Sequence, residues 1–355
     1  MTAAICGIGL VGGFGNGLPA LERVLTGSRV SPTLVSIPTR EGQTRVPCLV
    51  AGTERLADFV STRNLRRMSH YIRLGLLAAF DAMADARILE PDRRGRLGVI
   101  VATGYGATGN NYAFQYPFED REEICGSPTR FSNSVHNAAA AYISIALKEM
   151  GPNHSITHED LSFSSALLTA VTWLRQKRVD AVLVGGVDEL SHAHAYAWHV
   201  HCQRQQARFG EQDGPKVPLA AEGACFFVLK TANSTSTPYG TVREVMVGRY
   251  RGRPDPFPKA PFTILGTGGV AATKADYNHW IAANARCMSY ASVYGDLPVD
   301  SAFDTAIAAL SRQKNKIFTD DRMAQPGKLP ESLDGRSIAC LKLGVGNTFG
   351  WTLLA

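Results

Sequence analysis

The stretch SHAHAYAWHVHC contains a dense group of potential metal ligands. His192 and His194, and then His199 and His201, form two H-x-H pairs. Histidine is a common zinc ligand, but a zinc site needs ligands that converge and hydrogen-bonded support behind them. The alternative interpretation is a polar, partly exposed interface segment, and the sequence favours it. We therefore expect no metal and no cofactor.

Two further patterns could carry chemistry. Ser162, Ser164 and Ser165 could supply a hydrolytic nucleophile, but no G-x-S-x-G elbow is present. Glycine-rich turns at residues 104–106 and 185–186 follow expected strands. Neither completes G-x-G-x-x-G before a helix with an acidic residue at the required distance, so we expect no nucleotide site.

The elements that must position any such site alternate along the chain. Short apolar runs typical of buried strands are interleaved with stretches of helical apolar spacing. Continuous apolar strands between helices predict an α/β fold with a mostly parallel sheet covered on both faces. In the first half, the expected strands are 3–10, 97–102 and 181–184, and the expected helices are 18–25, 71–86, 137–150 and 164–175.

A polar segment at residues 231–239 interrupts this pattern and marks the boundary between two α/β halves, 1–232 and a shorter 233–355. Beyond it, the strand and helix signals resume, and residues 319–334 read as a loop. The expected strands of the second half are 240–247, 262–265, 337–341 and 351–354, and the expected helices are 273–284 and 300–310.

The composition is that of an ordinary globular chain. Of its 355 residues, 45% are hydrophobic and 19% charged. No apolar run reaches the ~18 residues of a membrane helix, and the N-terminus lacks the basic region of a signal peptide, so we expect a cytoplasmic protein without membrane insertion. The seven cysteines show no CxxC spacing and predict free thiols.

The net charge of +6 is mild for a chain of this length. The basic residues form short clusters, such as Arg63, Arg66 and Arg67, without a stripe or a nucleic-acid-binding motif. We therefore expect no nucleic-acid partner. An acidic protein partner fits this charge, and so does a merely solvated surface.

Seven motifs in order resemble those of the β-ketoacyl-[acyl-carrier-protein] synthases, over nearly the whole chain. Each motif is weak alone, and the order makes the resemblance specific. It implies the thiolase-like fold, in which two similar α/β halves form a five-layered αβαβα architecture. The motifs are ICGIGLVGGFGNG, RRM, GVIVATGYG, SNSVHNAAAAYISI, GPNHSI, DAVLVGGVDE and LGVGNTFGWTLLA. YGDLPVDSAFDTAIA, at 294–308, is similar to the synthase-like proteins of aryl polyene pathways.

The resemblance also implies where catalytic residues would stand. The family's nucleophilic cysteine corresponds to Asp160, and its two histidines to Leu265 and Asp296. Its lysine corresponds to Ala291 and its gating phenylalanine to Val345. A carboxylate is a poor acyl acceptor, and leucine has no hydrogen-bonding group. We therefore expect that no catalytic set is intact and that condensation is lost, with Asp160 serving as a helix cap.

The aromatic stretch NYAFQYPF follows the glycine turn. The resemblance to chain length factors implies that this part of the dimer interface lines the end of an acyl tunnel, and interface core is the alternative. We expect tunnel or interface roles for Tyr112, Phe114, Tyr116, Phe118, His136 and Asn137.

Together these observations predict a catalytically silent chain length factor. It would pair with an active β-ketoacyl synthase subunit as a heterodimer or heterotetramer, complete the acyl tunnel, and work with an acyl carrier protein. Two alternatives remain open. One is a priming enzyme that decarboxylates a malonyl carrier with Asp160, helped by His158. The other is a scaffolding homodimer.

Overall fold

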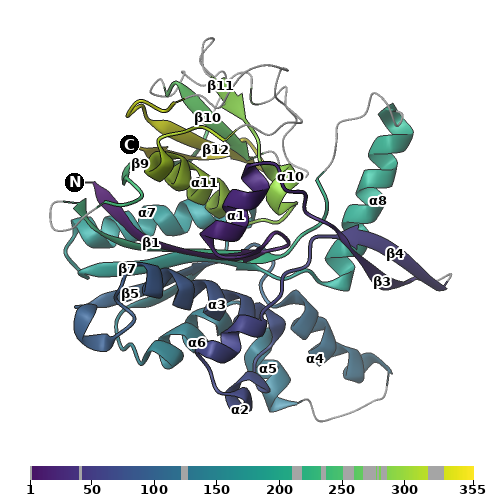
Figure 1. The fold of residues 1–355 in the computed structure, drawn as a ribbon. Helices are drawn as coiled ribbons and strands as arrows, with labels where there is room; N and C mark the ends of the chain where they lie inside the picture. The colour runs from purple at the N-terminus through teal and green to yellow at the C-terminus, as the bar shows by residue number, and fades with distance from the viewer. Residues whose placement is uncertain are drawn as a thin grey trace.

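The computed structural model describes residues 2–39, 42–120, 127–209, 218–232, 237–250, 260–266, 277, 280, 286–318 and 332–355, with only the backbone at 93, 116–120 and 205–209. The first half folds into strands and helices that alternate as expected (Figure 1). Its main elements are β1 (Ala3–Gly12), α1 (Leu18–Leu25), α3 (His70–Asp85), β5 (Leu97–Ala102), α4 (Thr108–Asp120), α5 (Pro128–Ser134), α6 (Ala138–Leu147), β6 (Asn153–Ile156), η3 (Glu159–Leu161), α7 (Ser162–Arg175), β7 (Ala181–Asp188), α8 (His192–Phe209) and β8 (Gly223–Thr231).

The second half contributes the other strands of the large sheet. Its elements are β9 (Thr241–Arg249), β10 (Phe262–Gly266), β11 (Arg286–Met288), α10 (Ala291–Tyr294), α11 (Asp300–Lys314), β12 (Ile338–Gly344) and β13 (Thr348–Leu354). Smaller elements complete the described chain: β2 (Gly15–Asn16), β3 (Thr33–Thr39), β4 (Gly42–Cys48), η1 (Glu54–Asp58), α2 (Thr62–Leu65) and η2 (Pro91–Arg93).

Most described strands form one large sheet in the order β11-β10-β12-β13-β9-β1-β8-β7-β5-β6, with β2 beside β1, and β3 and β4 form a separate two-stranded sheet. The halves meet where β1 pairs with β9 through two residue pairs, Ala3 with Val242 and Ala4 with Thr241. The expectation of a mostly parallel sheet was wrong. Four strands of the centre, β13, β9, β1 and β8, pair antiparallel. β1 and β8 are buried along almost their whole length, so their sequences show the continuous apolar runs that also mark parallel strands.

Helices lie on both faces of the first half's strands. α3 and α6 cover one face, and α7 and α11 lie between these strands and those of the second half (Figure 1). The contact of α3 with β1 explains two glycines, because a Cβ on Gly7 or Gly9 would lie 2.4 or 2.1 Å from a carbonyl oxygen of α3. A layered α/β fold is therefore confirmed. Of the expected outer helix, 273–284, only the buried Tyr277 and Trp280 lie inside the described residues.

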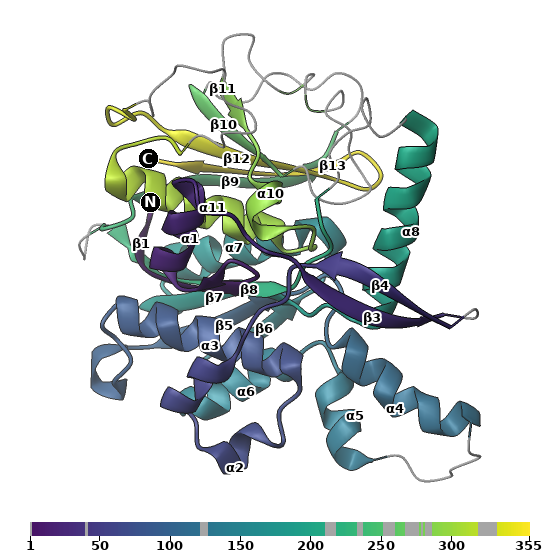
Figure 2. The ribbon, with the colours of Figure 1, turned by 45° about the vertical axis from the view of Figure 1, so that its right-hand side comes forward.

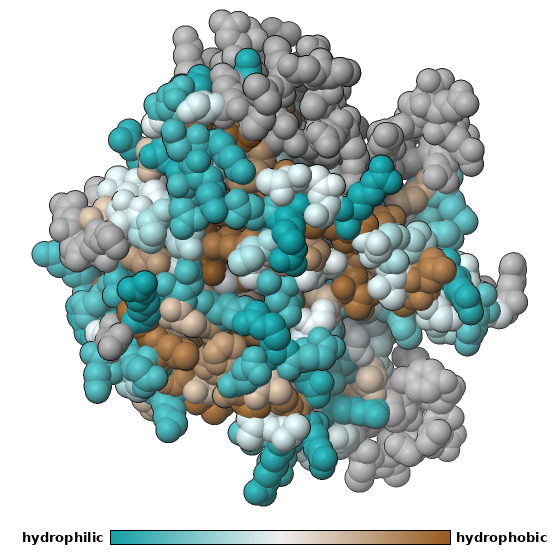
Figure 3. All heavy atoms as spheres, viewed as in Figure 1, coloured by the Kyte–Doolittle hydropathy of each residue, from teal (hydrophilic) through white to brown (hydrophobic). Residues whose placement is uncertain are grey.

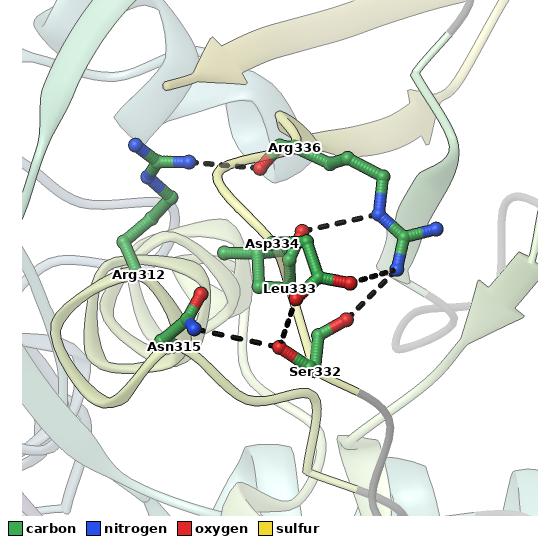
Figure 4. Close-up of polar contacts among 6 residues, drawn as sticks. All are labelled: Arg312, Asn315, Ser332, Leu333, Asp334 and Arg336. Carbon is green, nitrogen blue, oxygen red and sulfur yellow. Dashed lines mark hydrogen bonds and ion pairs between the residues drawn. The ribbon is translucent and has the colours of Figure 1, made fainter.

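The turn before β12 is tied to α11 (Figure 4). Arg312 donates to the carbonyl oxygens of Gly335 and Arg336 at 3.0 and 2.8 Å. Arg336 donates back to the carbonyls of Leu333 and Ser332 at 3.1 and 2.8 Å. These bonds fix the start of β12 against α11.

Most expected elements match the structure within a few residues, and two differences are informative. α6 stops at Leu147, because Lys148 adopts a left-handed conformation with φ of 56°. The aromatic stretch of residues 112–118 is part of helix α4. None of the described helices is long and apolar enough to cross a membrane.

Candidate functional site

The candidate site lies where β5, β6 and β7 end, because the carboxyl ends of parallel strands share one edge of a sheet. The turn η3, which contains Asp160, follows β6 and packs against β12. Asp296 lies in the loop before α11 and is buried, with a relative exposure of 3%. The fold thus brings Asp160 of the first half close to the second half.

Asp160 is partly exposed, and its surroundings act on its charge. Burial raises the pKa of Asp160; the charge of Lys342 opposes this shift, and Asp296 adds to it. The expected capping role was wrong. α7 begins at Ser162 with Leu161 at the N-cap position and no side-chain cap hydrogen bond. Asp160 lies in the preceding 3-10 turn, one residue too early for the first N–H groups of α7.

The other positions singled out by the sequence have different environments. Leu265 is a buried residue of β10, paired with Leu341 of β12. Ala291 begins α10 and is part of the main hydrophobic core. Val345 is 61% exposed in the turn between β12 and β13. Leu265 and Ala291 therefore contribute packing, whereas Asp160 and Asp296 contribute charge.

A buried ion pair that the sequence analysis missed lies beside them. Lys342 Nζ is 2.6 Å from Asp300 Oδ2, and the two side chains are 1% and 0% exposed. Burial lowers the pKa of Lys342, but the charges of Asp300 and Asp160 outweigh this effect and raise it above its usual range. Lys342 is therefore an ammonium held in the interior.

Hydrogen bonds extend this buried polar group. Tyr294 donates from its hydroxyl to Asp304 Oδ1 at 2.7 Å, and both residues are buried. The hydroxyl of Tyr277 accepts from the backbone N–H of Leu343 at 3.1 Å. This hydrogen bond from Leu343 holds the β12 backbone beside Lys342 in place. A signal in the sequence could have shown this group: Asp300 and Asp304 are one turn apart on a helix whose first twelve residues, 300–311, are all buried.

His194 of α8 comes close to Asp296. Its Nε2 is 3.9 Å from Asp296 Oδ2, and its ring meets that of Tyr105 edge-on with centroids 4.6 Å apart. His192, His199 and His201 lie along the same helix. No group of three or more His, Cys, Asp or Glu side chains suited to a metal ion occurs in the described part of the chain.

Asp188, at the end of β7, shapes the turn after β5. Its carboxylate accepts from the Thr103 hydroxyl at 2.6 Å and from the backbone N–H groups of Gly104 and Tyr105 at 3.1 and 2.9 Å. Burial raises the pKa of Asp188 to about 6, although these hydrogen bonds favour the charged form. The backbone N–H groups of Gly104 and Tyr105 already donate to this carboxylate, and they therefore cannot also bind a ligand's oxygen.

The aromatic residues of α4 do not share one face. Residues two apart on a helix point in nearly opposite directions, so Tyr112 is 54% exposed whereas Phe114 packs on Phe131 of α5 with ring centroids 5.6 Å apart. Phe131 is itself 58% exposed and was not singled out from the sequence. The side chains of Tyr116 and Phe118 lie outside the described residues.

The segment that joins α5 to α6 contains the other two expected interface residues. His136 and Asn137 are exposed, and the His136 carbonyl accepts from the buried Tyr71 hydroxyl at 3.1 Å. Further along α6, Ile145 is 72% exposed. Figure 2 shows α4 and α5 side by side, extending away from the sheet.

Sequence comparison decides the family. The model of the family described as "Beta-ketoacyl synthase, N-terminal domain" matches residues 4–234. The chain belongs to this family. Among curated relatives it is 24% identical to 3-oxoacyl-[acyl-carrier-protein] synthase 2 of Rhizobium meliloti (strain 1021), over 52% of this chain and 46% of the relative. It is 26% identical to the chloroplastic 3-oxoacyl-[acyl-carrier-protein] synthase I of Arabidopsis thaliana, over 52% and 40%.

The chain therefore spans about half the length of the curated relatives that it matches. Solved structures of the family have the same fold over the whole chain. A chain of the ishigamide ketosynthase/chain length factor is 17% identical with a TM-score of 0.75, covering 100% of this chain and 99% of that one. A chain from a ketosynthase in complex with its chain length factor, from Xenorhabdus doucetiae, is 15% identical with a TM-score of 0.76, covering 100% and 98%. The thiolase-like α/β fold of the synthases is thus confirmed.

Within this family fold, the start of α7 contains no thiol. A thiolate at a helix N-terminus is a good acyl acceptor, but residues 157–165 contain no cysteine. Carboxylates and a buried ammonium stand at the ends of the strands instead. Such a group can hold protons and charge.

Proposed function

We propose that this chain is a catalytically silent chain length factor that pairs with an active β-ketoacyl synthase and completes its acyl tunnel, in polyene, polyketide or fatty-acid-like biosynthesis, with the aryl polyene type as the nearest subgroup. One observation carries the proposal: the chain keeps the family fold, and Asp160, a carboxyl whose burial raises its pKa, stands at the position that the sequence resemblance assigns to the nucleophilic cysteine. The partner would be an intact synthase, with an acyl carrier protein delivering its substrates.

The surface of the first half supports a protein partner. β6 lies at the end of the described sheet, and an edge strand offers unpaired N–H and C=O groups to another chain. Exposed apolar side chains lie on α5 and α6: Phe131 is 58% exposed and Ile145 72% exposed. Figure 3 shows apolar side chains at the surface over the α3–α6 layer and near the β3–β4 hairpin. Large apolar interfaces are typical of obligate subunits.

The proposal is tested by co-expression with an intact synthase from the same gene neighbourhood. We expect a stable one-to-one complex that forms product, whereas this chain alone forms no condensation product and takes no acyl group from a loaded carrier protein. A homodimer that ignores the synthase would support the scaffold instead. A covalent acyl adduct at Asp160 in the mass spectrum would contradict the proposal outright.

A substitution of Asp160 distinguishes a silent subunit from a decarboxylating enzyme. We expect Asp160→Asn to change the free energy of unfolding by less than about 1 kcal/mol at neutral pH, because no cap hydrogen bond is lost, and to leave product formation by the complex intact. Burial raises the folded-state pKa of this carboxyl. The native state therefore loses stability as pH rises above the ordinary aspartate pKa of 3.8, and the variant does not.

Denaturation at several pH values, together with product assays, checks this expectation. The stability of Asp160→Asn relative to the native chain should increase as pH rises from about 4. Release of carbon dioxide from a malonyl carrier by the isolated native chain, lost in Asp160→Asn, would favour the decarboxylase.

The aromatic residues of α4 and α5 should influence product length in the complex. Trimming a ring that blocks the tunnel opens room for further two-carbon units, because packed interiors adapt poorly to extra volume. We expect longer products with at least one of Tyr112→Ala, Phe114→Ala, Phe118→Ala and Phe131→Ala, at nearly normal rates of early condensation. Mass spectrometry of the products measures this. An unchanged length distribution at normal activity for all four variants would leave these rings as interface core.

A further inference from the structure

The crevice at the strand ends is filled by the chain's own side chains. In open α/β sheets, ligands bind in the crevice beyond the carboxyl ends of the strands. In this chain the segment before α11 occupies that place. A Cβ on Gly104, just after β5, would lie 2.2 Å from the Cβ of Pro298. A Cβ on Gly186, near the end of β7, would lie 2.7 Å from the Cβ of Val299.

At the carboxyl end of β10, in the second half, a side chain fills the space in the same way. A Cβ on Gly266, the last residue of β10, would lie 2.7 Å from the Cδ of Lys342. The Lys342 side chain therefore runs along the end of β10 and places its ammonium against Asp300 at 2.6 Å. Pro298, Val299 and Lys342 are all buried.

The contacts of Pro298 and Val299 are linked to the Lys342–Asp300 ion pair through the chain itself. Pro298 and Val299 directly precede α11, whose first residue is Asp300. The Lys342–Asp300 ion pair thus holds the segment that covers Gly104 and Gly186. Separating the pair would leave a buried charge without its counter-charge, which is costly. The filling is therefore a fixed part of the core and does not behave as a loop that an acyl chain could displace.

We infer that this subunit is closed to acyl chains by Pro298, Val299 and the Lys342–Asp300 ion pair, in addition to lacking a nucleophile. Restoring a thiol at position 160 would then not restore loading with a long acyl chain. The inference extends the proposed function: in the complex, only the partner would hold a growing chain, and this subunit would contribute surface to that single tunnel.

The test uses Asp160→Cys in the full chain and two thioesters with the same leaving group, acetyl- and octanoyl-N-acetylcysteamine. Both need the same thiolate, so their rate ratio reports the available space and is independent of thiol reactivity. Because Asp160 is partly exposed, the introduced thiol should be acetylated. Peptide mass spectrometry should show octanoylation at position 160 about tenfold or more slower. Equal rates would overturn the inference.

A second variant tests the cause. Adding Pro298→Ala and Val299→Ala to Asp160→Cys removes side-chain volume at Gly104 and Gly186 and should bring the octanoyl rate toward the acetyl rate. A folded triple variant, shown by its circular dichroism, that still rejects the octanoyl group would contradict the assignment to these two side chains. The ratio in Asp160→Cys alone still tests closure if the triple variant does not fold. Neither measurement needs the synthase, so failure here is distinct from failure to form the complex.

Discussion

Replacing Lys342 by methionine is expected to lower the free energy of unfolding by about 3–5 kcal/mol, because it leaves the buried Asp300 carboxylate without its counter-charge. The two side chains are 1% and 0% exposed, so water cannot solvate the remaining charge. A loss of this size is a large part of a domain's net stability. Chemical denaturation of the purified chain measures it.

Two further variants separate charge from packing. Lys342→Met combined with Asp300→Leu should be clearly more stable than Lys342→Met alone, since apolar residues of similar size can replace a buried pair. Lys314→Met is the matched control: its partner Glu22 is 3.0 Å away, but the side chains are 42% and 28% exposed. That change should cost less than about 1 kcal/mol. A similarly small cost for Lys342→Met would show that the buried ion pair contributes little to the free energy of unfolding.

The second large effect is expected at the proposed interface. Ile145→Asp should abolish the complex with the synthase, weakening binding by about 100-fold or more, because it places an unpaired carboxylate in an apolar contact. The same change should alter the stability of the free chain by less than about 0.5 kcal/mol, because Ile145 is 72% exposed. Size-exclusion chromatography of the co-expressed subunits, followed by product assay, measures the loss of the complex, and chemical denaturation of the free chain measures its stability.

Val345→Asp provides the matched control for this experiment. Val345 is similarly exposed, at 61%, but lies in the turn between β12 and β13 in the second half. It should leave the complex intact. If Ile145→Asp also binds the synthase normally, then α6 is not part of the interface, and the exposed apolar side chains of α5 and α6 need another explanation.

Much of the architecture was predictable because it depends on local patterns. Apolar periodicity located β1, α3, β5, α7 and α11 within a few residues, and motif order identified the synthase-like fold. Strand direction was not predictable: a strand covered on both faces has a continuous apolar sequence whichever way its neighbours run. The aromatic stretch was hard to interpret for a related reason. Alternation suggests one aromatic face on a strand, but α4 is a helix that separates Tyr112 from Phe114.

The sequence by itself determined which side chains are available at the start of α7, and hence that no thiol stands at position 160. Tertiary structure alone decided what surrounds that position. Lys342 and Asp300 are 42 residues apart and meet only because β12 packs against α11. His194 and Asp296 are 102 positions apart in the sequence, yet Nε2 of His194 lies 3.9 Å from Oδ2 of Asp296. No local pattern encodes such pairs, because burial and the nearest charge depend on how distant elements pack.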